Sequence, residues 1–297
     1  MNTSVCAVIL TYNEEQHIKR CIKSLRNVVE HIYVMDSYST DNTIEILSKM
    51  DNVTILQNRF VNYASQFNFA LDSFEIDSDW IIRIDADEYV DEELSRYLTN
   101  ELSKVENSVN GIYFNRYMKF MGSLLKYGGM SSYWMLRLWR NGYGRCELTW
   151  MDEHIVLSEG DTCKAKGKLI DDNLNNLSWW SHKHVNYSTR EAVDILLREL
   201  SLQNDSLKPK IFGSSAERTR FLKNTYNKIP LFVRPFIYFM FRFFFKLGFL
   251  DGKSGFIWAI LQGFWYRMLV DAKVYELKKA SNGNIKNVIK EKYGLDV

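Results

Sequence analysis

Three carboxylates, Asp85, Asp87 and Glu88, follow an apolar run that covers residues 80–84. The run predicts a buried strand, and alternate residues of a strand point to the same side, so Asp85 and Asp87 should share one face. Open α/β sheets bind ligands outside the carboxyl ends of their strands. Mg²⁺ and Mn²⁺ take oxygen ligands, usually one or two carboxylates together with substrate phosphates. The pattern therefore indicates a metal-diphosphate site, although an acidic turn in which Asp91 caps the next helix explains the same residues.

The surrounding elements predict an α/β fold with a parallel sheet, because strands alternate with helices at short spacing. Asn13 is the expected N-cap of the first helix. Polar residues follow three strands, at 11–14, 36–41 and 85–87, and would open on the same edge of the sheet. No glycine-rich phosphate loop is present, so a diphosphate must be held mainly by metal. The expected strands of this half are residues 5–10, 31–35, 53–56 and 80–84.

The composition excludes several classes of protein. The chain has 297 residues, enough for one large domain or two smaller ones, and 46% of them are hydrophobic, which excludes a disordered chain. A net charge of +2 gives no global field for nucleic acid. The four cysteines have no metal-ligand spacing, and the N-terminus has no signal-peptide pattern. We therefore expect reduced thiols and a protein that stays in the cytoplasm.

Residues 11–15 (Thr-Tyr-Asn-Glu-Glu), 36–43 (Asp-Ser-Tyr-Ser-Thr-Asp-Asn-Thr) and 85–88 (Asp-Ala-Asp-Glu) closely resemble the successive signatures of family 2 glycosyltransferases of the GT-A fold. The resemblance is nearest to bacterial enzymes that build lipopolysaccharide, capsule or exopolysaccharide. It implies a Rossmann-like, mostly parallel sheet, an inverting hexosyltransferase, a divalent cation (Mg²⁺ or Mn²⁺) and a nucleotide-sugar donor, with a UDP-sugar favoured. The implied acceptor is a saccharide or a lipid-linked saccharide.

The resemblance also assigns roles to single residues. Asp36 would accept a hydrogen bond from the base, Asp85 would face the ribose and the metal-bound diphosphate, and Asp87 would bind the metal with help from Asp85. Alternatives remain open, since Asn13 can act as a helix cap alone and the helix that carries Gln66 and Asn68 can present them to solvent. The residues expected to line the nucleotide-sugar pocket are Thr11, Asn13, Glu14, Gln66 and Asn68.

Inversion requires a carboxylate on the acceptor side to take the hydroxyl proton. The family resemblance assigns this role to an acidic dipeptide, here Asp152-Glu153, with Glu153 favoured and Asp152 in reserve. The alternative is that one of the pair is a structural acid that pairs with Arg137 or Arg145. The glycine-rich stretch 119–132 is a plausible mobile acceptor loop.

A histidine late in the domain completes the metal sphere in many enzymes of this fold, which makes His184, or alternatively His182, a candidate ligand. A partly buried histidine whose hydrogen bonds go to backbone is the competing interpretation. Ser188 and Glu191 form a capping-box pattern that predicts a helix start.

The C-terminal region is dense in aromatic residues. Arg234, Arg242 and Lys246 interrupt the run at 229–250, so an amphipathic interfacial helix suits it better than a membrane span. A second apolar run covers residues 256–270. We expect contact with the inner face of the cell membrane, and packing on the catalytic domain or in a homodimer is the alternative.

These expectations combine into one organisation of the chain. Residues 1–226 form the catalytic domain, divided into a nucleotide-sugar half (1–110) and an acceptor half (111–226), and residues 227–297 form a membrane-associating helical region. The expected function is transfer of a sugar in bacterial surface polysaccharide or lipopolysaccharide biosynthesis. A non-catalytic nucleotide- or sugar-binding scaffold in a polysaccharide assembly complex is the alternative.

Overall fold

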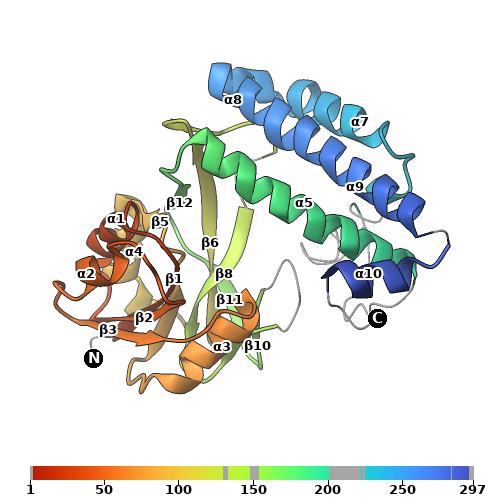
Figure 1. Cartoon of the computed structure of the whole chain (residues 1–297). Coiled ribbons are helices and arrows are strands. Elements are labelled where there is room, and N and C mark those ends of the chain that lie inside the picture. The colour runs from red at the N-terminus through yellow and green to blue at the C-terminus, as the bar shows by residue number, and fades with distance from the viewer. Residues whose placement is uncertain are drawn as a thin grey trace. The chain divides into compact units, whose positions relative to one another are not determined.

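The computed structural model describes residues 3–129, 133–147, 154–200, 222, 225–281 and 283–293 (Figure 1). The chain divides into two compact units. The first consists of Met1–Lys126 and Met130–Leu174, and the second of Tyr127–Gly129 and Asn175–Val297. The sequence predicts a division near residue 226 between a catalytic domain and a membrane-associating region. This functional division stays a prediction.

A mixed sheet forms the centre of the first unit. Within the described residues it has ten strands, eight of them in the order β3-β2-β1-β4-β8-β6-β12-β5. The first four run parallel, as predicted, and their ends lie within one residue of the expected positions. β8 then joins β4 antiparallel, and β12 lies parallel to β6. The strands are β1 (Val5–Thr11), β2 (His31–Asp36), β3 (Val53–Gln57), β4 (Trp80–Arg83), β5 (Glu88–Val90), β6 (Val109–Phe120), β7 (Ser123–Leu124), β8 (Tyr133–Arg140), β11 (Asp161–Lys164) and β12 (Leu169–Asp172), while β9 (Gly144–Cys146) pairs separately with β10 (Ile155–Leu157).

Helices cover both faces of this sheet. In β1, alternate residues enter different cores, since Ala7 packs with α1 (Ile18–Leu25), α2 (Thr43–Leu47) and α4 (Glu92–Asn100), whereas Val8 packs with α3 (Tyr63–Ser73). This alternation explains why the strand is apolar along its whole length. A short 3₁₀ helix, Leu102–Lys104, follows α4. The three layers confirm the α/β fold predicted from the sequence.

Two helix starts differ from the sequence predictions. α1 has His17 as its N-cap rather than Asn13. α5 (Leu177–Glu199) begins after Asn176, which accepts a hydrogen bond from the Trp179 backbone at 2.9 Å. Ser188, the expected helix start, lies inside α5 and is buried. Its hydroxyl donates to the Val185 carbonyl of the same helix and therefore does not cap a helix end.

Helices make up the second unit. α5 packs on α9 (Tyr266–Ala280), with Ile195 and Leu196 in one apolar cluster with Val270 and Val274. Among the helices that the structure describes, none has the length and apolarity needed to cross a membrane. The remaining elements are α7 (Arg234–Met240), the π-helix η2 (Phe241–Phe245), the 3₁₀ helix η3 (Gly248–Asp251), α8 (Gly252–Trp258), the π-helix η4 (Ala259–Trp265) and α10 (Ile285–Tyr293).

The stretch expected to be a mobile acceptor loop is in part firmly held. Tyr127–Gly129 belongs to the second unit, where the Gly128 backbone N–H donates to the Lys246 carbonyl at 2.8 Å. Arg242 donates to the Gly128 carbonyl at 2.5 Å, and Asp251 accepts from the Tyr127 N–H at 2.9 Å. Residues 127–129 of this stretch are therefore tied to the aromatic helices, whereas residues 119–120 and 123–124 belong to strands β6 and β7.

We predict that Gly167→Ala destabilises the first unit. Gly167 has φ +88°, and a Cβ there would lie 2.1 Å from the Leu94 backbone nitrogen, at the start of α4. The left-handed backbone and the overlap should together lower the free energy of unfolding by about 2–5 kcal/mol, as measured by urea denaturation. Gly142→Ala is the matched control, because Gly142 has φ +87° with nothing within 4 Å. Equal losses in the two variants would contradict the steric argument.

Candidate active site

Three strand ends meet at one edge of the sheet, because β2, β1 and β4 are parallel neighbours. Thr11 and Asp36 lie side by side in the register of β1 and β2, and the Thr11 hydroxyl donates to Asp36 Oδ1 at 3.0 Å. Asp36 is fully buried and also accepts from the Ser39 hydroxyl and backbone and from Gln57. Four hydrogen bonds occupy its acceptor positions, so contact with a base requires that one of them be exchanged. Its role in base recognition stays a prediction.

Asn13 joins the loops that follow β1 and β2. It has φ +56°, a left-handed conformation that asparagine tolerates better than most residues. Its backbone N–H donates to the Ser39 hydroxyl at 2.8 Å, and its side-chain oxygen accepts from the Thr40 N–H at 2.8 Å. The helix-cap interpretation is wrong, since α1 starts at Ile18 and its cap is His17, four residues after Asn13. Asn13 is exposed, and its place in the nucleotide pocket stays a prediction.

Glu14 is oriented by a buried histidine. Its Oε2 lies 2.6 Å from Nδ1 of His17, which is 1% exposed. The Leu174 backbone N–H donates to Nε2 of His17 at 2.8 Å, so Nε2 accepts and Nδ1 carries the hydrogen that faces Glu14. The histidine thereby links the loop after β1 to the last residue of the first unit.

Gln66 and Asn68 both lie on α3, and each forms hydrogen bonds with residues outside this helix. Gln66 is buried, accepts from Asn58 at 3.0 Å and donates to the Ser37 hydroxyl at 3.2 Å, so the solvated-face interpretation is wrong for this residue. Asn68 pairs with the backbone of Cys146 through two hydrogen bonds of 2.8 and 3.0 Å. Asn68 therefore holds β9, the strand that leads towards the acidic dipeptide.

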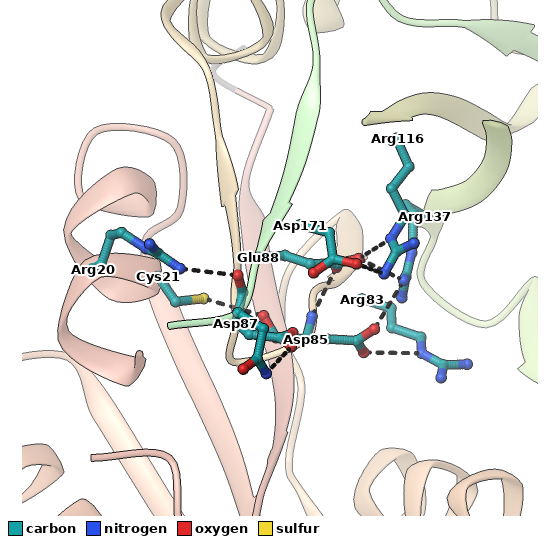
Figure 2. A network of polar contacts seen from close by, with 10 residues as sticks. Arg20, Cys21, Arg83, Asp85, Asp87, Glu88, Arg116, Arg137 and Asp171 are labelled. Atoms are coloured by element: carbon teal, nitrogen blue, oxygen red, sulfur yellow. Dashed lines mark hydrogen bonds and ion pairs between the residues drawn. The ribbon is translucent and has the colours of Figure 1, made fainter. Parts of the chain in front are cut away.

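Asp85 and Asp87 lie in a turn, because β4 ends at Arg83 and the Glu88 N–H donates to the Asp85 carbonyl. Asp85 Oδ2 accepts from Arg137 at 3.0 Å, and its Oδ1 lies 3.9 Å from Arg83 (Figure 2). Burial raises the pKa of Asp85, but the charges of Arg137 and Arg83 outweigh it and hold this pKa well below its usual range. Asp85 is thus a carboxylate whose charge is neutralised within the fold.

Glu88 joins Asp85 to a wider buried network. It is fully buried and accepts from Arg116 at 2.6 Å and from Arg137 at 3.1 Å, and its Oε2 accepts from the Asp85 N–H. Arg116 also pairs with Asp171 at 2.5 Å. Burial, together with the negative charges of nearby carboxylates, outweighs the charge of Arg116 and raises the pKa of Asp171 to about 7. Burial likewise raises the pKa of Glu88 against the charges of both arginines.

Asp87 has a different environment from Asp85. Its Oδ2 accepts from the side-chain amide of Asn173 at 3.0 Å, and no ion pair in the described part of the chain involves its carboxylate. Its backbone carbonyl accepts from Arg20 at 3.1 Å and from the Asp172 N–H at 3.1 Å. Asp87 is therefore a partly exposed carboxylate that forms no ion pair with the described residues.

The donor set fits a hard divalent cation. The described residues contain no group of three or more His, Cys, Asp or Glu side chains arranged to hold a metal ion. A cation that takes one or two carboxylates and completes its sphere with substrate phosphates needs no such group. Within the described residues the Asp87 carboxylate has no ion-pair partner, whereas Asp85 is already paired with arginine. The chemistry of these residues thus favours Asp87 over Asp85 as the ligand.

Asp152 and Glu153, the predicted base residues, lie outside the described residues. The described residues on either side of them form the antiparallel strands β9 and β10, and the Glu147 N–H donates to the His154 carbonyl at 2.9 Å. The two arginines considered as their partners have other contacts. Arg137 pairs with Asp85 and Glu88, and Arg145 pairs with Asp72 at 2.7 Å.

His184 lies on α5, in the second unit. Its ring stacks on Trp180 at 3.6 Å between centroids, and its Nδ1 is 2.8 Å from the Trp180 carbonyl. The carbonyl can only accept, so Nδ1 carries the hydrogen and Nε2 keeps a lone pair. Burial lowers the pKa of His184, which favours this neutral form. The hydrogen bond to the Trp180 carbonyl is expected for a histidine with a structural role only. It is equally expected for a metal-binding histidine, because the ring nitrogen that does not bind the metal usually donates to a carbonyl or carboxylate. His182 is exposed.

Most of the residues that form ion pairs or hydrogen bonds with Asp85, Asp87 and Glu88 were not identified from the sequence. Arg137 carried a signal, because it is a charged residue flanked by apolar residues inside strand β8, and a buried charge requires a partner. Asn173 and Asp171 carried none, since only the pairing of β12 with β5 and β6 brings them to this edge.

Comparisons with known proteins agree with this architecture. The profile described as "Glycosyl transferase family 2" matches residues 6–158, more than half of the chain. The chain therefore belongs to this family of glycosyltransferases, and the GT-A fold that its motifs imply is confirmed.

Individual relatives cover different parts of the chain. The lipopolysaccharide core biosynthesis glycosyltransferase LpsC of Rhizobium meliloti is 29% identical over 276 residues, which are 91% of each protein. An uncharacterized glycosyltransferase of Rickettsia conorii is 33% identical over 42% of this chain and 41% of its own. The crystal structure of residues 1–349 of S. aureus TarS in complex with UDP-GlcNAc has a TM-score of 0.45 and 14% identity, and it covers 94% of this chain and 91% of that chain.

We predict a pH dependence of stability that Asp171 controls. An unfolded aspartate has a pKa of about 3.9. Because the pKa of Asp171 is raised to about 7, the folded protein binds more protons than the unfolded chain between these values. Its contribution to the free energy of unfolding is thus present at low pH and is lost as the pH rises through about 7. Denaturation at pH 5 to 8 should show the wild type losing stability relative to Asp171→Asn, by at most about 3 kcal/mol.

The control for this experiment is Asp161→Asn, which changes an exposed aspartate on β11. Its stability should follow the wild-type pH profile. Parallel profiles for the wild type and Asp171→Asn would show that the raised pKa is wrong.

Proposed function

We propose that this glycosyltransferase moves a sugar, with inversion, from a UDP-sugar to a saccharide or lipid-linked saccharide in bacterial surface polysaccharide or lipopolysaccharide biosynthesis. The observation that carries the proposal is the strand edge, where one charged carboxylate, Asp87, lies beside Asp85, whose charge arginines already neutralise. The similarity to LpsC, which extends over 91% of both chains, supports a role in lipopolysaccharide assembly.

In this proposal, Asp87 holds a divalent cation, Mg²⁺ or Mn²⁺, and Asp85 orients the donor next to it. When bound, such a cation acts as a Lewis acid that stabilises the charge developing on the leaving diphosphate. Arg137 keeps Asp85 ionised and fixed, so this carboxylate is preorganised to accept hydrogen bonds from the donor. His184 remains a proposed further ligand, because its Nδ1–H is held on a carbonyl and its Nε2 keeps a lone pair.

Glu153 is the proposed general base, and Asp152 is the reserve. A base must take the proton of the acceptor hydroxyl as the new glycosidic bond forms, from the side opposite the leaving diphosphate. Neither Asp85 nor Glu88 suits this role, because arginines occupy both carboxylates. The scaffold alternative is less favoured, because the chain retains all the acidic positions of the family signatures, including the Asp152-Glu153 pair that binding alone does not need.

Exposed apolar side chains of the second unit support the proposal that the protein contacts a membrane. The aromatic surface, defined here as the exposed apolar side chains between residues 232 and 256, includes Phe245 at 78% exposed. Arg234 is buried against Asp271, and Arg242 donates to the Gly128 carbonyl, so these cations face inwards rather than outwards as the sequence suggested. The members of the aromatic surface are Phe232, Val233, Phe236, Ile237, Met240, Phe241, Phe244, Phe245, Leu247, Phe249, Leu250 and Phe256.

Exposed lysines accompany the aromatic surface. Lys228, Lys246 and Lys253 are exposed, and Asp251, the acid of this stretch, accepts a hydrogen bond from the Tyr127 backbone. Aromatic and aliphatic side chains with flanking lysines suit the headgroup region of an anionic membrane. We propose that this surface holds the enzyme at the inner face of the cell membrane, where a lipid-linked acceptor is available. A homodimer is the alternative occupant.

We predict that donor turnover depends on two separate carboxylates. With a panel of UDP-sugars and Mn²⁺, Asp87→Ala should lower turnover by at least about 100-fold, because the diphosphate loses its charge stabilisation. Glu153→Gln should lower kcat by about 10²–10⁴-fold and leave the donor Kd, measured by calorimetry, unchanged. Glu30→Gln, which changes an exposed acid between α1 and β2, is the control and should turn over the donor like the wild type. Donor binding without transfer or hydrolysis in the wild type would favour the scaffold, and normal turnover of Glu153→Gln would refute the assigned base.

The membrane proposal predicts flotation with vesicles that contain phosphatidylglycerol, with weaker flotation on phosphatidylcholine alone. Each buried Phe contributes about 1.5–3 kcal/mol, so Phe245→Ser should weaken binding roughly tenfold or more. Val61→Ser, at a 76% exposed position in the first unit, is the control and should float like the wild type. A wild type that does not float, but forms a dimer by light scattering that Phe245→Ser disrupts, would show that the surface serves a second copy.

A further inference from the structure

The three residues at the end of the first unit each contact the strand edge. The Asp172 N–H donates to the Asp87 carbonyl at 3.1 Å, and Asn173 Nδ2 donates to Asp87 Oδ2 at 3.0 Å. The Leu174 N–H donates to His17, the partner of Glu14. The exit of β12 therefore supports both Asp87 and Glu14.

The backbone of Asp87 is fixed independently of its side chain. Its carbonyl accepts from Arg20 and from the Asp172 N–H, each at 3.1 Å. Arg20 is itself bound to the Asp172 carboxylate at 2.7 Å. Among the described residues, Asn173 is the one side chain that anchors the Asp87 carboxylate, so its amide limits rotation of the Asp87 side chain. Loss of the amide should free the carboxylate and leave the turn in place.

The chemistry of the amide suits a carboxylate that must receive a cation. An arginine in this position would neutralise Asp87, as Arg137 does for Asp85. A neutral N–H donor occupies one lone pair of Oδ2 and leaves the charge and the Oδ1 oxygen for a ligand. Carboxylates that bind metals are commonly held by outer hydrogen-bond partners, whose loss lowers metal affinity by about 10–100-fold.

We propose that Asn173 is a positioning residue that orients the Asp87 carboxylate for the divalent cation. This inference rests on the proposed function, in which Asp87 is the metal ligand. Asn173 does not touch the cation or the substrate. It restricts the carboxylate to the rotamer in which Oδ1 is open, and so lowers the entropy lost when the cation binds.

Direct binding of Mn²⁺ to the whole protein tests the proposal. Free Mn²⁺ is measured by electron paramagnetic resonance during titration, with and without UDP, at a temperature well below unfolding. Asn173→Ala should raise the Mn²⁺ Kd about 10–100-fold. Asn173→Leu keeps the branched shape of the side chain without the N–H donor, so it should also weaken binding. In Asn173→Ala, saturating Mn²⁺ should restore most of kcat.

Asn62→Ala is the matched control. Asn62 lies in the same unit and loses one side-chain hydrogen bond, to the Ser65 N–H at the start of α3, without contact to either carboxylate. It should bind Mn²⁺ like the wild type although its stability falls by about 1 kcal/mol. A loss of Mn²⁺ affinity in Asn62→Ala equal to that in Asn173→Ala would show a general effect of stability and would overturn the proposal.

Two results separate failure of this inference from failure of the proposed function. If Asp87→Ala loses Mn²⁺ binding while both Asn173 variants bind like the wild type, Asn173 has no positioning role and the metal assignment stands. If Asp87→Ala binds Mn²⁺ like the wild type, Asp87 is not the ligand, and the metal assignment falls together with the inference. Should Asn173→Ala fail to fold, Asn173→Leu, which has the same branched shape and no donor, decides the question.

Discussion

The buried charge of Arg137 is the constraint on which the strand-edge site depends. The guanidinium lies in an apolar strand with 3% of its side chain exposed, so its charge must be neutralised inside the protein. Asp85 and Glu88 provide the neutralisation, and Arg116 extends the pairing to Asp171 on β12. Removal of one partner from such a group typically costs about 3–5 kcal/mol, because it leaves an uncompensated charge behind. The network therefore fixes the turn after β4 in one geometry.

The same network gives two similar carboxylates different chemistry. Asp85 belongs to the arginine network, which holds its pKa low and its orientation constant. The Asp87 carboxylate, two residues later, has the neutral amide of Asn173 as its one hydrogen-bond partner among the described residues and is open to a ligand. The acidic motif is therefore not one site with two equivalent ligands. One carboxylate serves the protein's internal charge balance, and the other remains available.

Charge burial also shapes the second unit. Arg234 and Asp271 are each 1% exposed and neutralise one another, and Arg242 is bonded to the Gly128 carbonyl. Two of the three cations that interrupt the aromatic sequence are thus turned inwards, and only Lys246 is exposed. The surface between residues 232 and 256 is consequently more apolar than its sequence suggests.

The sequence alone determined the parallel half of the sheet, since apolar runs such as residues 5–10 are local patterns that need no distant partner. It also determined the order of the acidic strand ends and the cap at Asp91, which depend on neighbours in the chain. Only the tertiary structure decided the partners of Asp85 and Asp87. Arg137 and Asn173 reach them from β8 and from the end of β12, and pairing between strands far apart in sequence is set by the packing of the whole sheet.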